Sequence, residues 1–74
     1  MLWFSMMQET IGITAGQVWD YLNQKGPATI IKLKSNLEVS NTMLCLALGW
    51  LAREDKIVIS KMNHTYEISL KQTS

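Results

Sequence analysis

One stretch of the chain decides the fold, and it reads Ser40-Asn-Thr-Met-Leu-Cys-Leu-Ala-Leu-Gly-Trp-Leu-Ala-Arg-Glu-Asp-Lys-Ile57. Serine is a preferred helix N-cap, so we expect a helix that begins at Ser40, has a long apolar body and ends in charged residues. With about 100° of rotation per residue, four apolar side chains fall within about a third of the circumference. They form the expected core face: Leu44, Ala47, Leu48 and Leu51.

The same helix carries a second group of large apolar residues, Met43, Leu46 and Trp50, called the apolar strip below. A helix that is apolar on two sides is normally buried on two sides, and a chain of 74 residues covers only one of them well. We therefore expect a homodimer in which Trp3 and Phe4 join the apolar strip. In the alternative, the N-terminal segment folds back and covers Trp50 within one chain.

A first helix is expected from Thr10, a suitable N-cap, to Gly26-Pro27, where a C-terminal glycine and a proline end it. Gly12 and Gly16 lie one turn apart in this helix and reduce its stability, so we expect another backbone or a large ring to approach them. Its expected core face has three- and four-residue spacing: Ile11, Ala15, Val18, Trp19 and Leu22.

A short strand or extended link is expected at residues 28–30, followed by a helix of about two turns with Thr29 as its cap. Its apolar line is Ile30, Leu33 and Leu37, and Lys32 and Lys34 point away from that line. After the helix beginning at Ser40, residues 57–62 and 65–70 alternate as two strands of a hairpin, with Asn63-His64 at the turn. The expected pairs are Ile59 with Ile68 and Ile57 with Leu70.

The order helix, short strand, helix, turn, helix, hairpin is that of an α+β winged helix-turn-helix domain. Two motifs, Ile11-Gly-x-x-Ala-Gly-x-Val-Trp-x-x-Leu22 and Ala47-Leu-Gly-Trp-Leu-Ala-Arg-Glu-Asp-Lys-Ile57, resemble a family of small bacterial winged helix-turn-helix proteins of unassigned function. The resemblance covers residues 10–70 and implies a winged-helix fold with a DNA-binding or transcription-regulatory role.

The chain divides into three parts by composition. Residues 1–9 are an apolar N-terminal extension in which we recognise no helical or strand period, residues 10–71 are the winged helix-turn-helix domain, and residues 72–74 are a polar tail. We expect the extension to dock on its own domain or on a partner subunit, and the alternative is an upstream segment with no role.

Composition narrows the class of protein. The single cysteine, Cys45, excludes an internal disulfide and a zinc-finger ligand set, and it favours a reduced, cytoplasmic setting. The sequence has neither a membrane-spanning apolar run nor the basic start of a signal peptide. The formal net charge is only +1, whereas strong nucleic-acid binders usually carry a marked basic excess. Any DNA binding is therefore expected to be weak and salt-sensitive.

In a winged helix the third helix presents its N-terminal residues to base edges in the major groove. The DNA-contacting residues expected here are Asn41 and Thr42 for the groove, with Lys32, Lys34, Lys61 and His64 for phosphates. Each has a plainer interpretation: the polar residues cap or solvate the helix, the lysines form a solvated face, and His64 is a turn residue.

The sequence contains no set of residues typical of catalysis. His64 has no cysteine or serine constellation near it, and there is neither a glycine-rich phosphate loop nor a carboxylate pair. We expect no enzyme activity, no cofactor, no metal and no small-molecule site. The competing hypothesis to DNA binding is a protein–protein interaction module on a winged-helix scaffold, because fold alone does not determine function.

Overall fold

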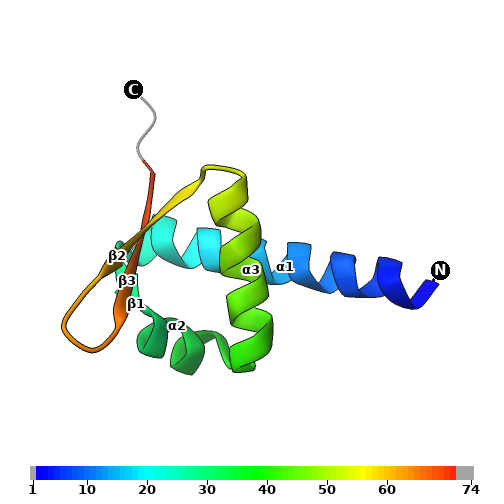
Figure 1. Cartoon of the computed structure of the whole chain (residues 1–74), viewed down its shortest axis with the longest axis horizontal. Coiled ribbons are helices and arrows are strands. Elements are labelled where there is room, and N and C mark those ends of the chain that lie inside the picture. Colours follow the sequence, from blue (N-terminus) through cyan, green and yellow to red (C-terminus); the bar gives the residue numbers. More distant parts are fainter. Residues whose placement is uncertain (1, 72–74) are drawn as a thin grey trace.

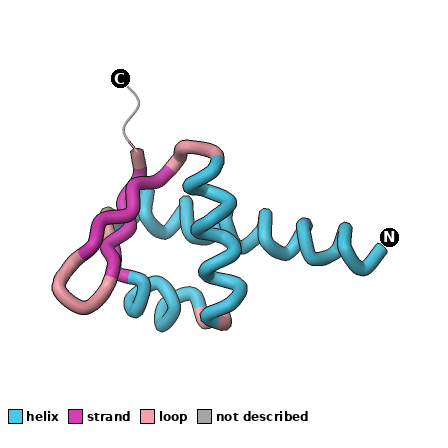
Figure 2. Tube along the Cα trace, viewed as in Figure 1, coloured by secondary structure: helices cyan, strands magenta, loops and turns pink. Residues whose placement is uncertain are grey.

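The computed structural model describes the backbone of residues 2–71 and the side chains of residues 8–71. Within this range three helices pack on a small antiparallel sheet (Figure 1, Figure 2). In chain order the elements are α1 (Leu2–Lys25), β1 (Ala28–Thr29), α2 (Ile30–Leu37), α3 (Asn41–Arg53), β2 (Ile57–Lys61) and β3 (Tyr66–Leu70). This is the order expected from the sequence, and the α+β winged-helix fold is confirmed.

Helix α1 is longer than the sequence indicated, because it begins at Leu2 and not near Thr10. The expectation that residues 1–9 have no helical period is wrong, since positions 4, 7 and 11 repeat at three- and four-residue steps and Leu and Met favour helix. In Figure 1 the first turns of α1 extend past α3. Met1, the tail at 72–74 and the side chains of Trp3 and Phe4 lie outside the described residues, and the division of the chain at residue 10 stays a prediction.

Thr10 lies inside α1 and is not its N-cap, but local capping sets the end of α1 and the start of α2 as the sequence indicates. Gly26, at φ 87°, donates its N–H to the Leu22 carbonyl at 2.9 Å and ends α1. The hydroxyl of Thr29 accepts a hydrogen bond from the Lys32 N–H at 3.2 Å and begins α2. These caps satisfy backbone groups that the helix ends leave without intrahelical partners.

The turn between α2 and α3 depends on one left-handed residue. Glu38 has φ 54° and ψ 45°, and its N–H donates to the Lys34 carbonyl at 3.0 Å. Val39 packs against the core. The Ser40 hydroxyl then accepts the Met43 N–H at 3.1 Å and caps α3. The turn thereby fixes the position of the first turn of α3 relative to α2.

Helix α3 ends at Arg53, and the charged residues after it form a turn rather than more helix. Asp55 adopts φ 61° and lets the chain reverse into β2. The Asp55 carboxylate accepts a hydrogen bond from Lys71 Nζ at 2.6 Å, which links this turn to the end of β3. Both side chains are exposed, so the ion pair stabilises the fold by no more than about 1 kcal/mol.

The three strands are antiparallel in the order β1-β3-β2. The predicted pairs Ile57–Leu70 and Ile59–Ile68 are both present. Their burial differs, however: Ile68 in the central strand is fully buried, whereas Ile59 in the edge strand is exposed. The hairpin therefore extends beyond the helices that cover its base.

The core lies where α1, α2 and α3 meet the sheet, and all four residues of the expected core face of α3 are buried in it. On α1 the expected core face is confirmed in part: Ala15, Val18 and Leu22 are buried, whereas Ile11 is half-buried and Trp19 is 37% exposed. Val18 is fully buried, and Trp19, the next residue along the helix, is turned by about 100° from it. Tyr21 packs against the core and Thr14 is buried, on the other side of Val18.

Candidate nucleic-acid interface

The residues expected to contact DNA gather at one end of the molecule. Helix α2, the first turn of α3 and the loop between β2 and β3 all lie on the lower side of Figure 1, away from the junction of α3 with β2. Helix α2 also contacts both β1 and β3, so the hairpin is held beside it. The fold thus brings together groups that are more than 30 residues apart in the sequence.

At the first turn of α3 the side chains divide between capping and solvent. The Ser40 hydroxyl accepts the Met43 N–H and caps α3, as the sequence indicates. Asn41 and Thr42 are exposed, and no side-chain hydrogen bond engages them within the described part of the chain. Their polar groups are therefore available to an external partner.

The candidate phosphate contacts lie on α2 and on the hairpin, at the same end of the molecule as this turn. Lys32 and Lys34 are exposed on α2, Lys61 is exposed at the end of β2, and His64 is exposed in the loop that follows. The ion pair found among residues 8–71 joins Lys71 and Asp55, so it leaves these cations unpaired. These cations are few. The exposed carboxylate of Glu38 in the α2–α3 turn further reduces the positive charge of this end of the molecule.

Large apolar side chains are exposed at the same end, and sequence reasoning did not select them. Ile31 on α2 is 69% exposed, and Ile59, Met62 and Tyr66 on the hairpin are also exposed. Ile31 could have been found because it lies off the line of Ile30, Leu33 and Leu37. This end of the molecule is therefore mixed, with basic groups beside apolar ones.

The apolar strip of α3 is only partly covered in a single chain. Met43 is half-buried, Leu46 is 39% exposed and Trp50 is 42% exposed. Residues 2–9 continue α1 as a helix, so their backbone does not fold back over Trp50 as the single-chain alternative requires.

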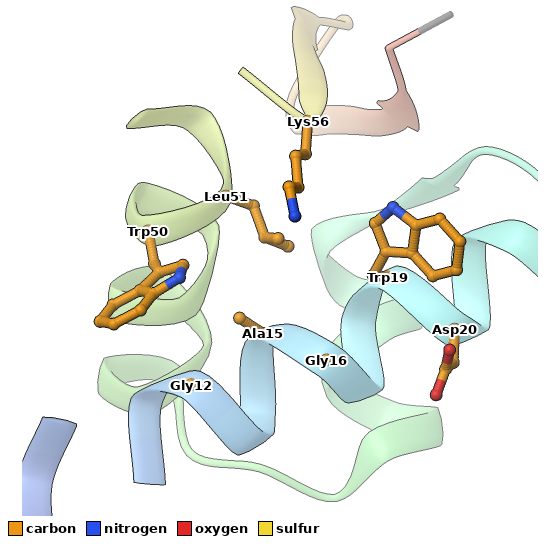
Figure 3. Close-up of a pocket in the computed structure, with 8 residues that line it drawn as sticks. All are labelled: Gly12, Ala15, Gly16, Trp19, Asp20, Trp50, Leu51 and Lys56. Carbon is orange, nitrogen blue, oxygen red and sulfur yellow. The ribbon is translucent and has the colours of Figure 1, made fainter. Parts of the chain in front are cut away.

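The glycines of α1 also differ from expectation. A Cβ added at Gly12 or Gly16 would meet nothing within 4 Å, so neither a backbone nor a ring of the same chain approaches them. They line an open groove between α1 and α3, with Trp19 and Trp50 on its sides (Figure 3).

Other site types find no support in residues 8–71. No three His, Cys, Asp or Glu side chains gather there in a way that would hold a metal ion. Within the described chain, α1 is too polar and the other helices are too short to cross a membrane.

Comparisons with known proteins agree with this architecture. Residues 6–70 match the family model described as a winged helix-turn-helix domain (DUF2582). The uncharacterized protein MJ1608 of Methanocaldococcus jannaschii is 36% identical over 63 residues, which cover 82% of this chain and 90% of that protein. The solution NMR structure of protein BT2368 from Bacteroides thetaiotaomicron superposes with a TM-score of 0.76 at 38% identity, covering 85% of this chain and 77% of that one. On its fold and these matches, the chain belongs to the winged helix-turn-helix family DUF2582.

Proposed function

We propose that this protein is a cytoplasmic, non-enzymatic DNA-binding regulator that acts as a homodimer. The observation that carries the proposal is the exposure of Asn41 and Thr42 in the first turn of α3, which lies at the same end of the molecule as α2 and the hairpin loop, with α2 between α3 and the hairpin (Figure 1). This is the arrangement in which winged helices present a recognition helix to the major groove.

Each group has a role that suits its chemistry. The Asn41 amide is able to pair with adenine through two hydrogen bonds, and Thr42 offers a methyl group to thymine or a hydroxyl to a phosphate. Lys32 and Lys34 on α2, and Lys61 with His64 on the hairpin next to α2, supply positive charge to the DNA backbone. Few phosphate contacts per subunit make the binding weak and sensitive to salt.

The homodimer forms through the apolar strip together with Trp3 and Phe4. The support is the partial exposure of Leu46 and Trp50 on α3, together with the N-terminal turns of α1, which extend past α3 (Figure 1). A two-fold interface of this kind buries the same surface on both subunits. Two subunits also double the number of phosphate contacts, which compensates for the small charge of each.

A second candidate function is protein recognition without DNA. The observation that favours it is the exposed apolar set at the same end of the molecule, Ile31, Ile59, Met62 and Tyr66, in a chain whose net charge is only +1. Apolar residues exposed together with a polar rim are typical of protein-interaction sites.

Fluorescence anisotropy with a labelled random DNA duplex, at low and at moderate salt, separates the two functions. Lys34→Gln and Lys61→Gln are expected to weaken binding, whereas Lys56→Gln, at the opposite end of the molecule, is the matched control that leaves it unchanged. No binding of the wild-type protein at low salt would reject the DNA function and favour the second candidate.

A further inference from the structure

A groove between α1 and α3 is separate from the candidate nucleic-acid interface. It has a volume of about 320 Å³, within the range of small-ligand sites. Gly12, Ala15 and Gly16 of α1 and Leu51 of α3 line its floor. Figure 3 shows Trp50 and Trp19 on its two sides, so the walls are aromatic and the floor is small and apolar.

One positive charge is directed into this groove. In Figure 3 the Lys56 side chain enters from the α3–β2 turn, and its ammonium group lies between Leu51 and Trp19. The neighbouring Asp55 is paired with Lys71. Asp20 also lines the groove, but its carboxylate points away from Lys56 in this view, and the two form no ion pair. The Lys56 ammonium is thus unpaired among the described residues.

The indole groups add to the positive character of the groove. An indole nitrogen is only a hydrogen-bond donor, and in Figure 3 the nitrogen edges of Trp19 and Trp50 are turned to the Lys56 side. A ligand that enters therefore meets donors at one end and an apolar floor at the other. A negatively charged group attached to an apolar body matches both.

We propose that this groove binds a small carboxylate with an apolar, preferably aromatic, body. The carboxylate accepts hydrogen bonds from the Lys56 ammonium, and the ring lies over Gly12 and Gly16 between the two indoles. Neither glycine has a side chain, and a Cβ added at either would meet nothing within 4 Å, so there is free space above the floor for the ring. The inference does not rest on DNA binding, because the groove lies away from α2 and the hairpin loop. The groove shares Trp50 with the proposed homodimer interface, so the acid and a second subunit are expected to compete for that side chain.

NMR titration of the isotope-labelled protein tests the proposal, with 3-phenylpropionate as the probe. Two control compounds separate the contributions: 3-phenylpropionamide has the same shape without charge, and acetate has the charge without the ring. The indole N–H signals of Trp19 and Trp50 and the amide signals of Gly12 and Gly16 are expected to shift saturably with the acid. The amide and acetate are each expected to bind at least about tenfold more weakly, as loss of a charged hydrogen bond or of the buried ring implies.

Two variants test the residues. Lys56→Gln removes the charge, and its side chain makes no contact on which the fold depends, so about a tenfold loss of affinity is expected. Gly16→Leu fills the floor and is expected to abolish binding while the protein stays folded by circular dichroism. Lys34→Gln, on α2, is the matched control and is expected to bind the acid as the wild type does.

Several results would overturn the proposal. One is that the indole and glycine signals do not shift at millimolar 3-phenylpropionate. Another is that 3-phenylpropionamide binds as tightly as the acid, and a third is that Lys56→Gln leaves the affinity for the acid unchanged. Failure of the DNA function is measured separately, because Lys56→Gln is expected to keep DNA binding and lose the carboxylate. Lys34→Gln is expected to do the reverse.

Discussion

Replacing Trp50 by alanine tests the proposed homodimer, and the structure gives the size of the effect. Trp50 is 42% exposed, which for a side chain of roughly 250 Å² leaves about 100 Å² for a partner to cover. At about 25 cal/mol per Å², its burial on association contributes about 2.5 kcal/mol per subunit and about 5 kcal/mol for the two-fold pair. If the partner subunit covers the exposed part of Trp50 completely, Trp50→Ala is expected to raise the dimer dissociation constant more than about a thousandfold. If the partner covers half of it, the expected rise is about sixtyfold.

The buried part of Trp50 also stabilises the single chain, so folding must be measured beside association. Sedimentation velocity over a range of protein concentrations gives the dimer constant, and urea denaturation gives the free energy of unfolding. A chain lacking residues 1–8 is a second test that leaves α3 unchanged, and it too is expected to be monomeric. Ile31→Ala, which alters an exposed apolar residue at the other end, is the matched control and is expected to dimerise normally.

Two results would refute this reasoning. One is a wild-type protein that is monomeric at tens of micromolar. The other is a folded Trp50→Ala protein that associates as strongly as the wild type, which would place the subunit contact elsewhere.

Three further predictions concern the fold and are read by urea denaturation. Leu44 is fully buried, so Leu44→Ala is expected to lower the free energy of unfolding by about 2–5 kcal/mol, and a loss no larger than that of the exposed Ile31→Ala would contradict the assigned core. Glu38 adopts a left-handed conformation that favours glycine, so Glu38→Gly is expected to raise stability by about 0.5–1 kcal/mol; a decrease would mean that the Glu38 side chain stabilises the turn. A Cβ at Gly16 meets nothing and alanine favours helix, so Gly16→Ala is expected to add about 1 kcal/mol, whereas a loss would show a close neighbour at that position.

The order of elements and the hairpin register follow from the sequence because they depend on local patterns. The alternation on either side of Asn63-His64 admits one register that keeps the apolar residues together, and Ile59 does pair with Ile68. The caps at Thr29 and Ser40 were also predictable, since hydroxyl side chains before a helical period have few other roles.

The start of α1 and the side that Trp19 faces were not predicted correctly. Most of residues 1–9 are apolar, so the apolar and polar faces of a helix there differ little in sequence. The three- and four-residue spacing of positions 4, 7 and 11 was therefore missed. Trp19 was assigned to the core because it lies four residues after Ala15 and three before Leu22. The position of Val18 at the centre of the buried face instead turns Trp19 toward the groove.

The candidate sites depend on tertiary placement, which no local pattern supplies. The sequence identifies Lys34 and Lys61 as cations, but only the fold brings α2 and the hairpin to the same end. The groove is a stronger example, because Lys56 and Gly16 are 40 positions apart in the chain and only the crossing of α1 and α3 brings them together. The function of small and charged residues that have no role in local structure is therefore the hardest to predict from sequence.

The most direct test of DNA binding through α2, α3 and the hairpin is the salt dependence of affinity for a random duplex. Three exposed lysines, Lys32, Lys34 and Lys61, at about 0.9 per phosphate contact, predict a slope of log affinity against log salt of about −2.7 per subunit. For the contacts of one subunit, a fourfold rise in salt then weakens binding about fortyfold, and Lys34→Gln with Lys61→Gln together reduce the slope to about −0.9 per subunit. A homodimer that makes both sets of contacts is expected to show twice these slopes. A wild-type protein that binds no DNA at low salt, or a double variant with an unchanged slope, would contradict the account.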